Sequence, residues 1–231
     1  MEALLALKRV LFGIVSALLV ASCSDRIPNN NTARILAMGD SFLAWQSSEG
    51  AAIPDYLEQE LGEMVINRSV TGSYMTRSLS IGGGLGIDIP KQYKASDWKW
   101  VILSGGGNDL RFGCGCRNCD EKLDTLISVD GTSAAIPELV QKIRAGGAQV
   151  IYIGYIPSPG VISPVDICEN EAIELEKRLT RMASADPGVY FISNADLVPF
   201  GDRSFHAEDM IHPSEKARRD ITARVANIIL R

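Results

Sequence analysis

The sequence contains only two histidines, His206 and His212, among its 231 residues. It has no H-E-x-x-H pair, so a catalytic zinc would have few candidate ligands, and we expect neither a metal nor another cofactor. It also lacks a basic cluster, and Asp and Glu outnumber Lys and Arg by 28 to 23, so the net charge is −5. A chain without a basic surface is not expected to bind nucleic acid. These absences argue against two large classes of protein, the zinc hydrolases and the nucleic-acid binders.

The chain also lacks an apolar run long enough to cross a bilayer as a helix. Its mostly apolar stretch from Val10 to Ala21 follows the basic pair Lys8-Arg9 and is shorter than the roughly 20 residues that a membrane span needs. This order is typical of a secretion signal. The residues Val20-Ala21-Ser22 before Cys23 are typical of a bacterial lipoprotein signal, which is cleaved before a cysteine that becomes lipid-modified. Cleavage nearby by ordinary signal peptidase, with Cys23 incidental, is the alternative.

These features predict three segments. Residues 1–22 form a lipoprotein signal peptide, and residues 23–32, which are polar after Cys23, form a flexible tether. Residues 33–231 have the length of one folded domain. We therefore expect an exported protein, held on the periplasmic side of a cell-envelope membrane by a lipid at Cys23. Ser24 after the cysteine favours the outer membrane in a Gram-negative host.

Four further cysteines, Cys114, Cys116, Cys119 and Cys168, form an even set. In an oxidising compartment such a set predicts two disulfides, although the C-x-C-x-x-C cluster with a distant cysteine is also compatible with a four-thiolate zinc site. A bond between Cys114 and Cys116 would be the most strained, because one residue separates them. We therefore expect Cys168 to pair with Cys114 or Cys116, and the remaining pair to close inside the cluster.

Short apolar segments alternate with amphipathic segments along the chain, a pattern that predicts β-strands alternating with helices. The expected strands are 33–38, 64–67, 98–103, 149–153 and 189–192, and the expected helices are 53–61, 134–145, 169–182 and a last helix that opens at Pro213. Parallel strands need crossover connections, which cover both faces of the sheet. The fold class is therefore α/β, a three-layer α/β/α sandwich with a central parallel sheet. Ligands of such folds collect at the carboxyl ends of the strands.

Several residues with catalytic chemistry follow these strands. Gly39-Asp40-Ser41 ends the first strand, where a serine hydroxyl can point to the sheet edge; taken alone, this tripeptide is also an ordinary turn. Asp209 and His212 are three residues apart, so a carboxylate can orient an imidazole whose other nitrogen reaches a hydroxyl. Asn108, just after the third strand, supplies an amide that can donate to an oxyanion, and Gly72 allows a backbone N–H to approach one.

Together these segments resemble the SGNH/GDSL hydrolase family, whose blocks are Gly-Asp-Ser, a lone glycine, Gly-x-Asn-Asp and Asp-x-x-His-Pro in this order. The resemblance runs from Gly39 to Pro213 and implies the family's flavodoxin-like fold. It implies that Ser41 is the nucleophile, His212 the general base and Asp209 its partner, with Ser41, Gly72 and Asn108 forming the oxyanion hole. Phe42 replaces the leucine of the family motif, and the glycine run 82–86 competes with Gly72 for its role.

The function expected from this resemblance is a serine esterase that hydrolyses carboxylic esters through an acyl-serine intermediate. Alternatives are an acyltransferase or an O-acetyl esterase acting on envelope glycans, or a non-catalytic glycan-binding lipoprotein of the same fold. The expected partner is a small-molecule or glycan ester. We expect the substrate pocket to be walled by Trp45, Tyr74-Met75 and the loop Ile156 to Ile167.

Overall fold

The structure is a computed structural model that describes residues 32–76, 86–160 and 163–231. The expected signal peptide, Cys23, all of the expected tether except Thr32, and most of the glycine run 82–86 lie outside these residues. Within the described residues, no helix is both long and apolar enough to span a membrane.

The expected central sheet has five parallel strands. They are β1 (Ile35–Met38), β2 (Val65–Asn67), β3 (Trp100–Leu103), β4 (Gln149–Ile153) and β5 (Val189–Ile192). Their order across the sheet is β2-β1-β3-β4-β5, which is the flavodoxin-like order. The chain moves outward from β1 in one direction to β2 and then in the other through β3 to β5. This reversal places the end of β1, and the residues after it, beside the end of β3.

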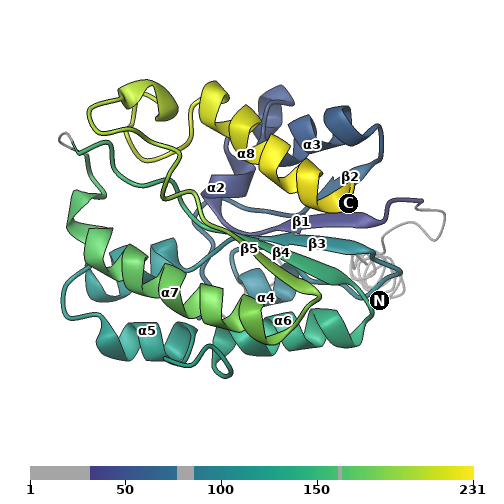
Figure 1. Ribbon diagram of the computed structural model, residues 1–231, viewed down its shortest axis with the longest axis horizontal. Coiled ribbons are helices and arrows are strands. Elements are labelled where there is room, and N and C mark those ends of the chain that lie inside the picture. Colours follow the sequence, from purple (N-terminus) through teal and green to yellow (C-terminus); the bar gives the residue numbers. More distant parts are fainter. Residues whose placement is uncertain (1–31, 77–85, 161–162) are drawn as a thin grey trace, which may run out of the picture. The chain divides into compact units, whose positions relative to one another are not determined.

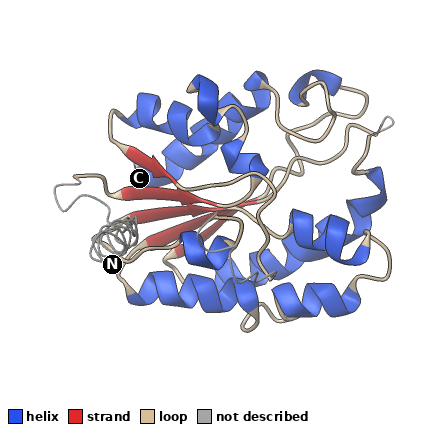
Figure 2. Cartoon of the chain, turned by 180° about the vertical axis from the view of Figure 1, so that it is seen from behind, coloured by secondary structure: helices blue, strands red, loops and turns tan. Residues whose placement is uncertain are grey.

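Helices cover both faces of the sheet, as Figure 1 and the reverse view in Figure 2 show. One face carries α3 (Ile53–Leu61) and α8 (Glu215–Ile229), and the other carries α5 (Asp120–Leu126), α6 (Ala135–Ala145) and α7 (Glu169–Ala185). The remaining short helices are α2 (Ser41–Ala44), α4 (Ile89–Gln92), the 3-10 turns η1 (Ser47–Glu49), η3 (Asp166–Cys168) and η4 (Arg203–Phe205), and the π-helix η2 (Asp109–Cys114). The predicted three-layer α/β/α sandwich is thus confirmed.

A continuous apolar core lies between the sheet and the α3/α8 layer. It includes the alternate strand residues Ile35 and Ala37 on β1 and Ile102 on β3, together with Leu57 of α3 and Ile221 of α8, and all five are at most 1% exposed. Burying each large aliphatic side chain contributes about 1.5–3 kcal/mol. This packing holds the carboxyl ends of β1, β3 and β4 in fixed positions, and the candidate site is built on those ends.

The start of the last helix differs from the prediction. Helix α8 begins at Glu215 instead of Pro213, because Ser214 is its N-cap and its hydroxyl accepts a hydrogen bond from Ala217 N–H. Pro213 instead forms an antiparallel bridge with His206. The residues between them therefore form a closed hairpin, 206–213, which we call the histidine hairpin.

Candidate functional site

Ser41 is the first residue of α2, directly after the turn that ends β1. Asp40 is the N-cap of this short helix, and its carboxylate accepts a hydrogen bond of 3.0 Å from Phe42 N–H. Gly39 is required before it, because a Cβ at this position would lie 2.4 Å from the carbonyl oxygen of Ser104. The N–H of Ser41 belongs to the first helical turn, where backbone donors have no partner inside the helix. The turn therefore leaves both a hydroxyl and a backbone donor at the carboxyl edge of the sheet.

The histidine hairpin brings Asp209 and His212 together. The Nδ1 of His212 is 2.5 Å from Oδ2 of Asp209, while Oδ1 accepts from the N–H groups of Ile211 and His212 at 2.9 and 3.0 Å. Burial opposes ionisation of Asp209, but these hydrogen bonds and the nearby imidazole outweigh it and lower the pKa of the carboxyl. The carboxylate is therefore suited to fix the ring so that Nε2 is the nitrogen available for proton transfer.

Trp45 lies flat against the ring of His212. The ring centroids are 3.9 Å apart and the planes are within 3° of parallel. The stack covers one face of the imidazole and restricts the orientation of its ring. The sequence predicted Trp45 as a wall of the substrate pocket, whereas the structure places its ring on the catalytic candidate itself.

Asn108 lies after β3, where its side-chain amide donates a hydrogen bond of 2.9 Å to the carbonyl of Ser73. A primary amide has two N–H donors, so this contact leaves one for a ligand. Gly72 precedes Ser73 in the turn after β2 and has the left-handed φ of 80° that favours glycine. The neighbouring Asp109 carboxylate accepts from Met75 and Thr76 N–H at 2.8 Å each. The two turns that carry Gly72 and Asn108 are thus fixed to one another.

A second carboxylate, that of Asp40, is held in a fully buried setting. Its Oδ2 accepts a hydrogen bond of 2.5 Å from the hydroxyl of Tyr155, and that hydroxyl accepts one of 2.9 Å from Gly107 N–H. Gly107 leaves room for this phenol, since a Cβ there would lie 2.8 Å from its Cζ atom. We call Asp40, Tyr155 and Gly107 the buried network. Burial raises the pKa of Asp40, against the opposing hydrogen bonds from Tyr155 and Phe42.

One cavity of about 340 Å³ joins these parts, because Ser41, Asn108 and His212 all line it. Its other walls come from the end of β4 and from α7, with Tyr155, Ile156 and Leu175 among them. The expected contribution of the 156–167 loop is seen for Ile156, Pro157, Ser158 and Val165, while Trp45, Tyr74 and Met75 are not among the lining residues. The mostly apolar lining and the size are those of a small-ligand pocket.

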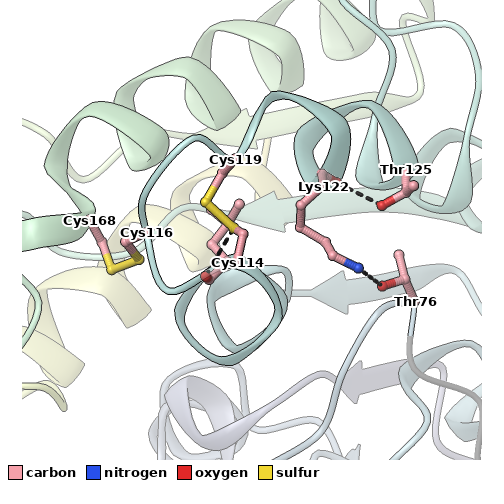
Figure 3. The surroundings of a disulfide bond; sticks show 8 residues. Thr76, Cys114, Cys116, Cys119, Lys122, Thr125 and Cys168 are labelled. Carbon is pink, nitrogen blue, oxygen red and sulfur yellow. Dashed lines mark hydrogen bonds between the residues drawn. A yellow bond between two sulfur atoms is a disulfide. The ribbon is translucent and has the colours of Figure 1, made fainter.

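Two disulfides join these cysteines, Cys114–Cys119 and Cys116–Cys168 (Figure 3). Their Cα separations, 5.5 and 4.8 Å, are within the usual range. The pairing agrees with one of the two arrangements expected from the sequence, and it excludes a four-thiolate zinc site at these cysteines. Since Cys168 lines the pocket, the long-range bond attaches the turn after Asn108 to the loop that precedes α7.

The second histidine, His206, lies on the same hairpin but has a different environment. It is buried, and burial lowers its pKa despite the attraction of Asp209. His206 does not line the pocket that contains Ser41 and His212. Within the described residues, no group of three or more His, Cys, Asp or Glu side chains is arranged to hold a metal ion.

Two polar residues that support the turns of the site were missed by the sequence analysis. Tyr155 follows β4 without any motif around it, and Gln92 lies on α4, outside all the sequence motifs named above. The Gln92 amide accepts from Gly39 N–H at 2.7 Å and donates to Gly39 carbonyl at 2.9 Å and Gly86 carbonyl at 2.6 Å. It thereby fixes the turn before Ser41. The sequence carries no signal for either role, because each depends on contacts between distant segments.

Comparison with known proteins gives one family and a set of similar structures. Residues 37–219 match the model of the GDSL-like lipase/acylhydrolase family. The solved structure of a GDSL-like lipase from Bacteroides thetaiotaomicron is 16% identical, with a TM-score of 0.57, over 85% of this chain and 87% of that one. That of a lipase from a goat rumen metagenome is 17% identical, with a TM-score of 0.55, over 84% and 97% of the two chains. No curated protein sequence matches the chain.

Proposed function

Because the chain belongs to the GDSL-like lipase/acylhydrolase family and is a hydrolase of ester bonds, we propose that it is a serine esterase whose nucleophile is Ser41. The observation that carries this proposal is the position of His212. Its Nδ1 is bound to Asp209 at 2.5 Å, and its ring lines the same cavity as Ser41 and Asn108. A nucleophile, a base and an oxyanion donor that share one pocket are the parts that acyl transfer requires.

In the first step, His212 removes the proton of the Ser41 hydroxyl as the oxygen attacks the ester carbonyl. The negative charge that develops on the carbonyl oxygen is stabilised by the free N–H of the Asn108 amide and by backbone N–H groups of Ser41 and Gly72. Asp209 stabilises the imidazolium formed at this stage, and the stacked ring of Trp45 holds it in place. The imidazolium then protonates the leaving alcohol, and an acyl-serine is formed.

In the second step, His212 removes a proton from water, which attacks the acyl-serine and releases the acid. A sugar hydroxyl in place of water would give acyl transfer by the same steps. Hydrolysis is favoured as the main reaction by the family to which the chain belongs. Incubation with an aryl ester and excess glycan, followed by mass spectrometry of the glycan, distinguishes the two: a transferase acylates the sugar, whereas an esterase releases free acid alone.

The test of the nucleophile is Ser41→Ala, assayed on a short-chain p-nitrophenyl ester. Removal of the attacking oxygen should lower kcat by about 10⁴-fold or more, with an unchanged thermal transition because a serine at the sheet edge contributes little packing. His212→Ala should act alike, and His206→Ala is the matched control because it changes the other histidine of the same hairpin. Full activity of Ser41→Ala, or equal losses from both histidine variants, would contradict the assignment.

We further propose that the mature protein is anchored to a cell-envelope membrane through a lipid on Cys23. The support is the order of the first 23 residues: a basic pair, an apolar stretch and small residues before a cysteine. Cys23→Ala should move the protein from the membrane fraction to the soluble fraction, since a lipid chain contributes about 0.8 kcal/mol for each buried methylene group. Retention of Cys23→Ala in the membrane fraction would show that the anchor lies elsewhere.

A further inference from the structure

The cavity beside Ser41 contains an acidic side chain that the proposed reaction does not use. Most of the cavity wall is apolar, with Leu110, Ile156, Leu175 and Leu179 among its residues, but Glu176 of α7 also lines it. Glu176 lies against Gly154, another lining residue, because a Cβ on that glycine would be 2.6 Å from Oε1 of the carboxylate. The carboxylate is therefore part of the wall of the cavity in which Ser41 and His212 lie.

The two oxygens of Glu176 differ in their partners. Oε2 accepts a hydrogen bond of 2.9 Å from the hydroxyl of Ser193. Oε1 has no hydrogen-bond donor among the described residues, and no Lys or Arg among them pairs with this carboxylate. Glu174, on the same helix, is different, because it forms ion pairs with Arg178 at 3.0 Å and Lys177 at 3.6 Å. Glu174 is thus paired with cations of the protein, whereas Glu176 forms no ion pair among the described residues.

A charge in this position is unfavourable without a partner. Burial raises the pKa of Glu176, the nearby Asp196 adds to this effect, and the Ser193 hydrogen bond only partly opposes it. A half-buried carboxylate in apolar surroundings gains most from a cation that enters the same space. The cavity therefore contains an unneutralised negative charge that a bound ligand can pair with.

The other charged groups of the cavity leave this charge uncompensated. Asp40 is already bound by Tyr155 and by Phe42 N–H, and Glu169 adds a further negative charge. Arg111 is the one Lys or Arg side chain among the described lining residues, and its guanidinium lies over the ring of Phe112 at 5.3 Å. Carboxylates thus outnumber cations around the space that a substrate would fill.

We propose that the substrate of this site is an ester that carries a positively charged ammonium group, with the ammonium bound by Glu176 while the ester carbonyl reaches Ser41. This proposal rests on the proposed function, and it names the class of ester. Glu176 acts in it as a specificity-determining residue: it contacts the substrate away from the reacting atoms and takes no part in proton transfer.

The test uses pairs of esters that have the same shape and differ only in charge. One member of each pair ends in a dimethylammonium group, which carries an N–H donor for Oε1 of Glu176, and the other ends in an isopropyl group. The acyl part is varied in one series, with a fixed p-nitrophenol leaving group, and the alcohol part is varied in a second series of acetate esters. In at least one series the wild-type protein should favour the charged member by about tenfold or more in kcat/KM, mainly through a lower KM.

Two variants of matched chemistry then assign this preference. Glu176→Gln keeps the size of the side chain and its hydrogen bond with Ser193 but removes the charge. The kcat/KM values for the charged and uncharged esters should therefore become about equal. Glu174→Gln removes a charge on the same helix but outside the cavity and should keep the preference. Equal rates for both members of each pair in the wild-type protein, or a preference unchanged by Glu176→Gln, would overturn the proposal.

Failure of the proposed function gives a different result. If no ester of either series is hydrolysed, the esterase assignment is wrong, and binding still tests the role of Glu176. Isothermal titration of the full chain with the dimethylammonium acid and alcohol from which the charged esters are built should show binding that Glu176→Gln weakens by about tenfold. The absence of such binding, together with hydrolysis that ignores charge, would show that Glu176 has no role in recognition.

Discussion

The histidine hairpin and the buried network each contribute an aspartate to the same site, and the two aspartates have opposite properties. Asp209 is partly exposed and is bound by groups two and three residues away, and its pKa is lowered. Asp40 is 2% exposed, and its partner Tyr155 is 115 residues away along the chain. Burial raises the pKa of Asp40. One carboxylate is thus placed by a local turn, and the other by the tertiary fold.

The difference indicates separate roles. In the proposed mechanism Asp209 orients the base and stabilises its charge, because it contacts the imidazole of His212 directly. Among the described residues, the Asp40 carboxylate is hydrogen-bonded to Phe42 N–H and Tyr155 and not to His212, and it joins the turn of Ser41 to the turn of Gly107 and Asn108 through the phenol of Tyr155. Asp40 is therefore a positioning residue. Substitutions of Asp40 or Tyr155 should lower kcat less than substitutions of Asp209.

The largest expected effect separates the two aspartates. Asp209→Asn should lower kcat by about 10³–10⁴-fold, because an amide can hold the imidazole in the wrong tautomer and cannot stabilise its charge. Asp40→Asn retains an acceptor for Phe42 N–H and should lower kcat far less. Steady-state kinetics on a p-nitrophenyl ester measures both, and equal losses would show that the distinction between orienting and positioning carboxylates is wrong.

The next effect compares the two disulfides, of which only Cys116–Cys168 has a cysteine that lines the pocket. Paired Cys116→Ser and Cys168→Ser substitutions open a bond between residues 52 apart, whereas Cys114→Ser with Cys119→Ser opens one between residues 5 apart. The chain-entropy relation gives losses of about 4 and about 2 kcal/mol in the free energy of unfolding. Urea unfolding under non-reducing conditions measures them. Similar losses from both pairs would indicate that strain or residual structure outweighs the loop length.

A smaller effect should follow from loss of the phenol hydroxyl. Tyr155→Phe leaves a buried oxygen of Asp40 without its donor and frees Gly107 N–H, so the turns of Ser41 and Asn108 lose their connection. We expect kcat to fall about tenfold with little change in KM. Tyr152→Phe is the matched control. Tyr152 is a residue of β4, and its hydroxyl donates to Gly105 carbonyl instead of Asp40. Equal changes in kcat for the two variants would indicate a structural effect only.

The smallest effect is a difference in the pH dependence of stability. Asp209 has a lowered pKa in the folded state, so its stabilisation is present above the usual value of 3.8 and is lost as the pH falls through the folded pKa. Asp40 has a raised pKa, so its contribution is present below 3.8 and is lost as the pH rises through the folded pKa. Urea unfolding between pH 4 and pH 7 should therefore show Asp40→Asn gaining stability relative to wild type as the pH rises. Asp209→Asn should show no such gain, and parallel curves would contradict the assigned directions.

The elements of the fold were largely predictable from the sequence. Strand β4 was predicted at its observed bounds of Gln149–Ile153, and α3 ends before Gly62, whose left-handed φ of 64° suits the end of a helix. These features depend on neighbours within a few residues. The start of α8 was wrong by two residues, because Ser214 caps the helix and Pro213 bridges to His206.

The residues of the site likewise fall into two groups, those that the sequence predicted and those that it did not. The sequence by itself determined the pairing of Asp209 with His212, because three residues separate them and a single turn brings them into contact. It also determined that Ser41 and Asn108 follow strands, and hence that both lie at one edge of a parallel sheet. Such features follow from local geometry and from apolar periodicity, and both depend on residues that are close together in the sequence.

Only the tertiary structure decided which distant groups meet at that edge. Tyr155 between Asp40 and Gly107, Gln92 on Gly39, Trp45 on His212 and Glu176 on the cavity wall all join residues from separate segments. Their positions depend on the strand order and on how the helices pack against the sheet. The type of a polar residue does not show whether its side chain binds water or a turn of the site. These contacts could therefore not be predicted from the sequence.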